Sequence, residues 1–194
     1  MLQVEKISSE VANIAGSLCG KPVVLVKFSK KGEEKDRNTI IDEIKALGLR
    51  NILLSGNISE FPEIRDIAVG LSTVGKHITL LTKATEGVDP FRILPNYHSF
   101  LVASFPDDPQ ANIFRPSNFP LLSEKDEVQF NVKALNDYEK MLLVIKSKLI
   151  TKPTIIVRVT KDASEKDFEI IKERYLTDCI RFTFRSLLSS DYIK

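Results

Sequence analysis

The fold is decided by residues 40–87, which read IIDEIKALGLRNILLSGNISEFPEIRDIAVGLSTVGKHITLLTKATEG. Two segments of this stretch place apolar residues three or four positions apart, as on one face of a helix, and two others are short continuous apolar runs of strand length. The pattern predicts a helix up to Gly48, a strand at 51–54, a second helix with Ser59 as its cap and Pro62 in its first turn, and a strand at 77–81.

The same alternation continues on both sides of this stretch. Further strands are predicted at 23–28, 99–103, 128–132, 154–159 and 180–184, and further helices at 136–149 and 164–175, the last opened by a capping box of Ser164 and Asp167. Neighbouring parallel strands need a crossover connection, which the intervening helices provide. We therefore predict an α/β fold with a mainly parallel sheet of about six to seven strands.

Apolar residues near the amino terminus follow a helical spacing. They predict a helix that Gly20 and Pro22 end, with an inward face of Val4, Ile7, Val11, Ile14 and Leu18. The 194 residues are enough for one substantial core and few for two. We expect a single domain over residues 1–194, with the amino-terminal helix at 1–20 and the α/β core at 21–190.

The charge of the chain is nearly balanced. Lys and Arg number 28 against 26 Asp and Glu, and the charges are interspersed. This distribution favours no nucleic-acid partner and no anionic membrane. Apolar runs stay well below the ~20 residues that cross a bilayer, and no signal pattern stands at the amino terminus, so we expect a cytoplasmic location.

The sequence contains two cysteines, Cys19 and Cys179, both in apolar surroundings. Two buried free thiols are favoured over a disulfide. Metal and iron-sulfur sites draw their ligands from short clustered motifs, and no CxxC occurs. Phosphate-binding patterns such as GxGxxG and GxxxxGK[ST] do not occur either. The residues therefore predict no metal, no cofactor and no nucleotide hydrolysis.

The order of elements resembles a known class of enzymes. Residues 40–87 are similar to the part of radical S-adenosylmethionine enzymes in which a helix, a strand ending in a GGEP motif, a second helix and a strand near a TNG-like turn follow one another. The stretches DEVQFNVKALNDYEKMLLVIK at 126–146 and DCIRFTFRSLLSS at 178–190 look more narrowly like the 7-carboxy-7-deazaguanine synthases of deazapurine biosynthesis. The resemblance covers roughly residues 21–190 and implies a partial, open βα barrel.

The resemblance also implies where the chemistry of such an enzyme would lie. In the radical enzymes the loop after the first strand carries three cysteines that hold an iron-sulfur cluster, whereas the corresponding loop here, 29–36, has none. Residues 55–58, Ser-Gly-Asn-Ile, stand in place of GGEP, and 82–84, Thr-Lys-Ala, in place of the TNG-like turn, with Leu81 where the family has an acid. Three cofactor-handling segments are altered together. The chain therefore resembles a degenerate relative of these enzymes that keeps their fold and has lost their chemistry.

Parallel βα folds bind ligands at the carboxyl ends of their strands, and several polar residues are predicted near strand ends. A histidine or an aspartate there could also take part in acid-base chemistry. The competing interpretation is that the glycine and proline contexts are plain turns and that the two histidines, at 77 and 98, are ordinary edge residues. The candidate ligand contacts are Ser55, Gly56, Asn57, Lys83, Asp107 and His98.

The connection from Phe105 to Pro120 is long and carries many apolar side chains. Long loops are often functional, and aromatic and Arg side chains are favoured at protein interfaces. The alternative is that these aromatics fold down onto the sheet. The candidate partner contacts are Phe105, Ile113, Phe114, Arg115 and Phe119.

Two functions of different classes follow from these observations. The favoured one is a non-catalytic radical-SAM-like protein that acts by binding, as a subunit or scaffold of an assembly or as a homodimer. The alternative is an enzyme of altered chemistry that retains a purine-like or other small ligand at the strand ends. A nucleic-acid scaffold is less favoured because the net charge is near neutral.

Overall fold

The computed structural model describes residues 1–56, 60–92, 94–106, 113–147, 150, 152–178 and 182–186, and for residues 176 and 182–186 it describes the backbone alone. The strands are β1 (Leu2–Val11), β2 (Pro22–Phe28), β3 (Glu33–Lys35), β4 (Asn51–Ser55), β5 (His77–Lys83), β6 (Tyr97–Ser104), β7 (Glu127–Val132), β8 (Thr154–Val159) and β9 (Phe182–Ser186). The helices are α1 (Arg37–Ala46), α2 (Ile64–Thr73), α3 (Leu135–Lys146) and α4 (Glu165–Thr177), with 3₁₀ turns η2 (Asp89–Phe91) and η3 (Pro116–Leu121).

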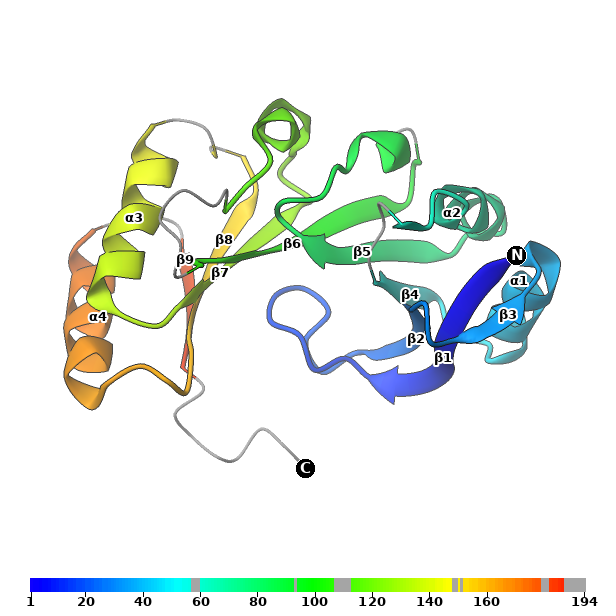
Figure 1. The fold of residues 1–194 in the computed structure, drawn as a ribbon, viewed down its shortest axis with the longest axis horizontal. Coiled ribbons are helices and arrows are strands. Elements are labelled where there is room, and N and C mark those ends of the chain that lie inside the picture. Colours follow the sequence, from blue (N-terminus) through cyan, green and yellow to red (C-terminus); the bar gives the residue numbers. More distant parts are fainter. Residues whose placement is uncertain are drawn as a thin grey trace.

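The described strands form one sheet in the order β3-β1-β2-β4-β5-β6-β7-β8-β9. The seven strands from β2 through β4 to β9 are parallel, whereas β1 pairs antiparallel with both β2 and β3. The sheet is an open arch with helices on its outer side (Figure 1). This architecture confirms the predicted α/β fold with an open, mainly parallel sheet.

The helix boundaries follow local signals. Asp36 accepts hydrogen bonds from the backbone N–H groups of Asn38 and Thr39 and so caps α1, and Gly48 follows the helix in a left-handed conformation, φ 70°. Ser164 caps α4 as predicted, because its hydroxyl accepts from the Asp167 N–H. The predicted cap of α2, Ser59, lies outside the described residues, and α2 itself begins at Ile64.

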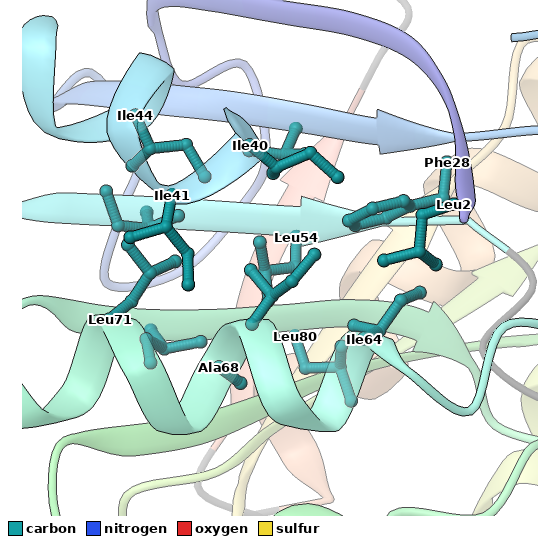
Figure 2. Packing of buried hydrophobic residues seen from close by; sticks show 14 of the residues in the cluster. Leu2, Phe28, Ile40, Ile41, Ile44, Leu54, Ile64, Ala68, Leu71 and Leu80 are labelled. Carbon is teal, nitrogen blue, oxygen red and sulfur yellow. The ribbon is translucent and has the colours of Figure 1, made fainter. Parts of the chain in front are cut away.

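The outer face of β1, β2, β4 and β5 is covered by α1 and α2 (Figure 2). The sequence pattern places Ile40, Ile41, Ile44 and Leu47 on the inward stripe of the first helix, and Ile64, Ile67, Ala68 and Leu71 on that of the second. All of these are buried except Leu47, the C-cap of α1, which is 38% exposed because the helix has ended there. Each fully buried Ile or Leu contributes about 1.5–3 kcal/mol relative to an exposed one, so this cluster is a main source of stability. The labelled members are Leu2, Phe28, Ile40, Ile41, Ile44, Leu54, Ile64, Ala68, Leu71 and Leu80.

A second outer core lies under α3 and α4 and packs on β6, β7 and β8. Tyr138 and Met141 of α3 and Ile171 of α4 are fully buried in it. Between the two cores, loop segments around η2 and η3 cover the sheet where no long helix stands. Among the described residues between α2 and α3, the helical segments are therefore the short turns η2 and η3.

The prediction of an amino-terminal helix was wrong, because residues 2–11 form β1. A β-bulge between Val4 and Lys6 explains the error. Val4 pairs with Phe28 and Ile7 with Val26, and both partners face the outer core, so the bulge brings two residues three positions apart to the same face. The bulged strand thus imitates the spacing of a helix.

The inner face of the sheet meets the connection between β1 and β2, residues 12–21. This connection, the inner loop, lies under the arch (Figure 1). Ala15 packs against Phe100 and Ile156 of the inner face, and Leu18 packs with Leu53. A segment predicted as the end of a helix therefore covers the middle of the concave surface.

Candidate functional site

The carboxyl ends of β4 and β5 lie at the same edge of the sheet. Ser55 pairs with Lys27 of β2 and with Leu81 of β5, and Lys83 follows two residues further along β5. The structure therefore brings the predicted Ser55, Gly56 and Lys83 to one edge. Asn57 and Asp107 lie outside the described residues.

Gly56 is required by packing at this edge. Its φ is 131°, and a Cβ atom there would lie 2.5 Å from the carbonyl oxygen of Phe28 at the end of β2. Side chains larger than hydrogen cannot approach a backbone oxygen this closely. The chain leaving β4 therefore turns tightly against β2.

The loop between β2 and α1, residues 29–36, decides whether an iron-sulfur cluster could be held as in the radical enzymes. Ser29 donates its N–H to the Gln3 carbonyl at 3.1 Å, and residues 33–35 pair with β1 as β3. A Cβ atom at Gly32 would lie 2.3 Å from the carbonyl carbon of Val4. The loop contains no thiol and its backbone is pressed onto β1, so the residues present do not fit an iron-sulfur cluster.

Further polar groups line the inner face near the carboxyl ends of β6, β7 and β8, and they form a set that we call the polar row. Gln129 donates to Asn131 at 2.8 Å, and Asn131 donates to the Ser104 hydroxyl at 3.0 Å. Asn131 also pairs in register with Arg158 of β8. The polar row therefore spans three neighbouring strands.

Arg158 is the unusual member of the polar row. It is half-buried, and burial lowers the pKa of its guanidinium. No hydrogen bond or ion pair joins that guanidinium to another residue in the described ranges. Sequence reasoning missed the polar row, although the alternation of Glu127, Gln129 and Asn131 with apolar residues along β7 was a usable signal.

His98 lies at the opposite end of the sheet from Lys83. It is the second residue of β6, and its Nε2 atom lies 3.1 Å from the Thr79 hydroxyl and 3.8 Å from Oε2 of Glu127. Burial lowers the pKa of its imidazole, an effect that the nearby Glu127 carboxylate opposes. The structure therefore does not bring His98 to the carboxyl-end edge with the other candidates.

His98 instead shares a cleft with His77, the first residue of β5. The cleft has a volume of about 320 Å³, and its walls include Lys21 of the inner loop and Asn51 of β4. Sequence alone could not show whether the two histidines converge. Among the residues that the structure describes, no group of three or more His, Cys, Asp or Glu is arranged to hold a metal ion.

Glu127 connects the cleft to the inner loop. Its carboxylate accepts from the Ser17 N–H at 2.7 Å and from the Ser17 hydroxyl at 2.9 Å. Glu127 is 5% exposed, so these charge-assisted hydrogen bonds hold the inner loop in place from within the protein. The Glu127 carboxylate therefore already accepts hydrogen bonds from Ser17 of the inner loop.

The described part of the connection after β6 folds toward the outer core. Phe105 and Phe114 are buried there, with Phe105 stacked on Phe130 and Phe114 stacked on Phe119 at a centroid distance of 4.5 Å. Ile113 and Phe119 are half-buried, and Arg115 is exposed, with its Nε donating to Ser117. Of these candidate partner contacts, Arg115 presents the most surface, and a partner role for the set stays a prediction.

Comparison with known proteins confirms the resemblance predicted from the sequence. The chain is 29% identical over 139 residues to a 7-carboxy-7-deazaguanine synthase of Clostridium acetobutylicum, a match that covers 68% of this chain and 59% of that relative. The crystal structure of QueE from Escherichia coli superposes with a TM-score of 0.72 at 12% identity, over 95% of this chain and 93% of that one. No family model matches the sequence. Within the described ranges, no helix has the length and apolar character needed to span a membrane.

Proposed function

We propose that this protein acts by binding and performs no radical chemistry. The observation that carries the proposal is the loop at 29–36, which has no thiol and is pressed onto β1 through Gly32. Amines, carboxylates and a serine hydroxyl cannot replace three thiolates on iron. The inner loop adds support, because Ala15 covers Phe100 and Ile156 in the middle of the concave face.

The partner in this proposal is a protein, either a different subunit of an assembly or a second copy of this chain. The strands β3 and β9 stand at the two ends of the sheet order, where a strand can be extended by another chain. Large apolar side chains also lie at the surface, with Leu143 of α3 69% exposed and Val74 after α2 50% exposed. Native mass spectrometry of the purified chain distinguishes a homodimer from a monomer that needs a different subunit.

The central test is anaerobic reconstitution with iron and sulfide. The purified chain and the Clostridium acetobutylicum relative are treated in parallel, followed by iron and sulfide quantification and by an assay for reductive cleavage of S-adenosylmethionine. We expect this chain to retain no stoichiometric cluster and to cleave no S-adenosylmethionine, while the relative serves as the positive control. A stoichiometric cluster bound to this chain would overturn the proposal.

Arg158 favours a second candidate function, the retention of a small ligand at the polar row. A half-buried guanidinium without a described partner is disfavoured by desolvation unless a ligand anion or acceptor pairs with it. A purine-like molecule with carbonyl or carboxylate acceptors suits Arg158 together with the Asn131 amide. Such a ligand would make the protein a small-molecule binder or an enzyme of altered chemistry.

Thermal unfolding in the presence of guanine derivatives or S-adenosylmethionine tests this second candidate. A ligand that binds only the native state raises the unfolding midpoint, and Arg158→Met should abolish the rise. Arg65→Met, which removes an exposed arginine of α2, is the matched control and should leave the rise unchanged. The absence of any midpoint change in the parent protein would remove the support for this candidate.

A further inference from the structure

The cleft at the amino ends of β4, β5 and β6 is chemically different from the polar row. Its walls carry two ammonium groups, two imidazoles and two amides, contributed by the inner loop, by three strand beginnings and by the segment before β7. None of its described lining residues carries a carboxylate. The six side chains that matter here are Lys21, Lys125, His77, His98, Asn51 and Asn96.

Most of these groups have no partner within the protein. The ammonium groups of Lys21 and Lys125, the ring of His77 and the side-chain amide of Asn96 make no hydrogen bond or ion pair with another described residue. A concave surface lined by unpaired donors of positive or neutral character concentrates anions. Hydrogen-bonding capacity in the cleft is therefore available to a ligand.

The nearest carboxylates already accept hydrogen bonds from other groups of the protein, and Oε2 of Glu127 also lies 3.8 Å from Nε2 of His98. The carboxylate of Glu127 accepts two hydrogen bonds from Ser17, and that of Asp126 accepts from Arg92, from the Ser99 N–H and from Ser123. Asp126 is fully buried and Glu127 nearly so. They support the strands behind the cleft and leave its lysines without an internal counter-ion.

We propose that this cleft binds a small phosphate monoester. A phosphate dianion offers several acceptor oxygens, which matches two ammonium groups and the N–H groups of His77 and His98. The amides of Asn51 and Asn96 are placed to meet polar groups of the organic part, such as sugar hydroxyls or a base. A volume of about 320 Å³ lies at the small end of ligand sites, which suits one small molecule.

This site is independent of the proposed binding function. It lies at the amino ends of the strands, whereas the loop at 29–36 and the polar row lie at their carboxyl ends. A protein that fails to hold an iron-sulfur cluster could therefore still bind the phosphate monoester, and the reverse holds equally. The two experiments are therefore independent: iron-sulfur reconstitution tests the loop at 29–36, whereas AMP binding tests the residues of the cleft.

The two histidines provide a direct readout. The sequence contains only these two, His77 and His98, and both line the cleft, so each imidazole Cε1–H signal in a proton–carbon NMR spectrum reports on the site. The groups that act on the His98 ring are Thr79, Glu127, Asp126, His77 and Lys21. A bound dianion adds negative charge to this set, which raises the pKa of the His98 imidazole.

The experiment titrates the full chain with AMP at constant ionic strength and follows both histidine signals. We expect saturable shifts of both signals, and tighter binding of AMP than of inorganic phosphate or citrate. The double variant Lys21→Ala, Lys125→Ala should bind AMP about tenfold more weakly or worse, because two charge-assisted contacts are lost. Lys166→Ala, on the exposed side of α4, is the matched control and should bind as the parent does.

Urea unfolding of each variant shows that the comparison is made between folded proteins. The absence of a saturable shift of either histidine at AMP concentrations up to about 10 mM would overturn the proposal. Citrate binding as tight as that of AMP would overturn the assignment to phosphate, and equal binding of AMP and inorganic phosphate would overturn the assignment to a monoester. Unchanged AMP affinity in the double variant would overturn the role of the lysines.

Discussion

The two ends of the parallel sheet differ in how the chain uses them. At the carboxyl ends, connecting segments press onto neighbouring backbone, as Gly32 does on Val4 and Gly56 on Phe28. At the amino ends, the inner loop leaves a cleft lined by Lys21 and other donors. The same fold therefore offers a site at either end, and the side chains and loop contacts decide which end stays available to a ligand.

The largest loss of stability should come from removing the Asp126 carboxylate, which supports the strands behind the amino-end cleft. Asp126→Ala removes the buried acceptor of Arg92, of the Ser99 N–H and of Ser123. Because it leaves a cation and backbone donors unpaired, we expect the free energy of unfolding to fall by about 3 kcal/mol. Urea unfolding measures the change, with the exposed Asp162→Ala as control. A loss below about 1 kcal/mol would show that this network does not hold the amino end.

A pair of glycine variants tests how tightly the carboxyl end is packed. Gly48 and Gly56 both have positive φ, but a Cβ atom meets nothing within 4 Å at Gly48 and a backbone oxygen at 2.5 Å at Gly56. Gly48→Ala should cost about 1 kcal/mol from the left-handed conformation alone, and Gly56→Ala about 1–2 kcal/mol more. Equal losses in chemical unfolding would mean that the turn after β4 can move away from Phe28.

The pH dependence of stability sharpens the contrast at the amino end. Burial lowers the pKa of His98 in the folded protein, with Glu127 opposing, so protonation favours the unfolded chain. The contribution of neutral His98 to the free energy of unfolding is fully present above about pH 6.5, the pKa of histidine in the unfolded chain. It is lost as the pH falls below that value toward the lower pKa of His98 in the folded protein.

We expect unfolding free energy to decline by less than about 1 kcal/mol between about pH 7.5 and pH 5.5 on account of this residue. Urea unfolding across that range measures the decline, and His98→Gln should flatten it. A variant with the same pH dependence as the parent would show that other groups cause the decline.

The smallest effect is expected at the polar row. Arg158→Met replaces a half-buried guanidinium that has no described partner, so without ligand the variant should be more stable by about 0.5 kcal/mol. The measurement is the urea midpoint, compared with that of Arg65→Met. A clear loss of stability would show that Arg158 already has a structural role in the unliganded protein.

Helices and strands could be predicted from the sequence wherever the spacing of the apolar residues depends only on which face of the element is buried. Ile40, Ile41 and Ile44 share one helical stripe and are all buried, and the continuous runs at 51–54 and 154–159 form parallel strands as predicted. The error at residues 2–11 arose because a bulge at Val4 changes the phase of the strand. A bulge depends on pairing with β2, which local periodicity does not encode.

The candidate site was less accessible. Ser55 and Lys83 were placed correctly at one edge because the carboxyl ends of parallel strands coincide. His98 was included among the candidate ligand contacts although it directly precedes the predicted strand at 99–103, and the structure places it at the beginning of β6, at the other end of the sheet. Arg158 and Lys21 were missed because their importance depends on which side chains surround them.

The sequence by itself determined the alternation of helices and strands after residue 20, the turn at Gly48, and the absence of thiols between β2 and α1. These properties are local, since they depend on side-chain period, backbone freedom and residue chemistry. Only the tertiary structure decided that the inner loop covers the concave face, that Arg158 stands without a described partner, and that two histidines share a cleft. Those outcomes depend on strand register and on contacts between distant segments, which no local pattern specifies.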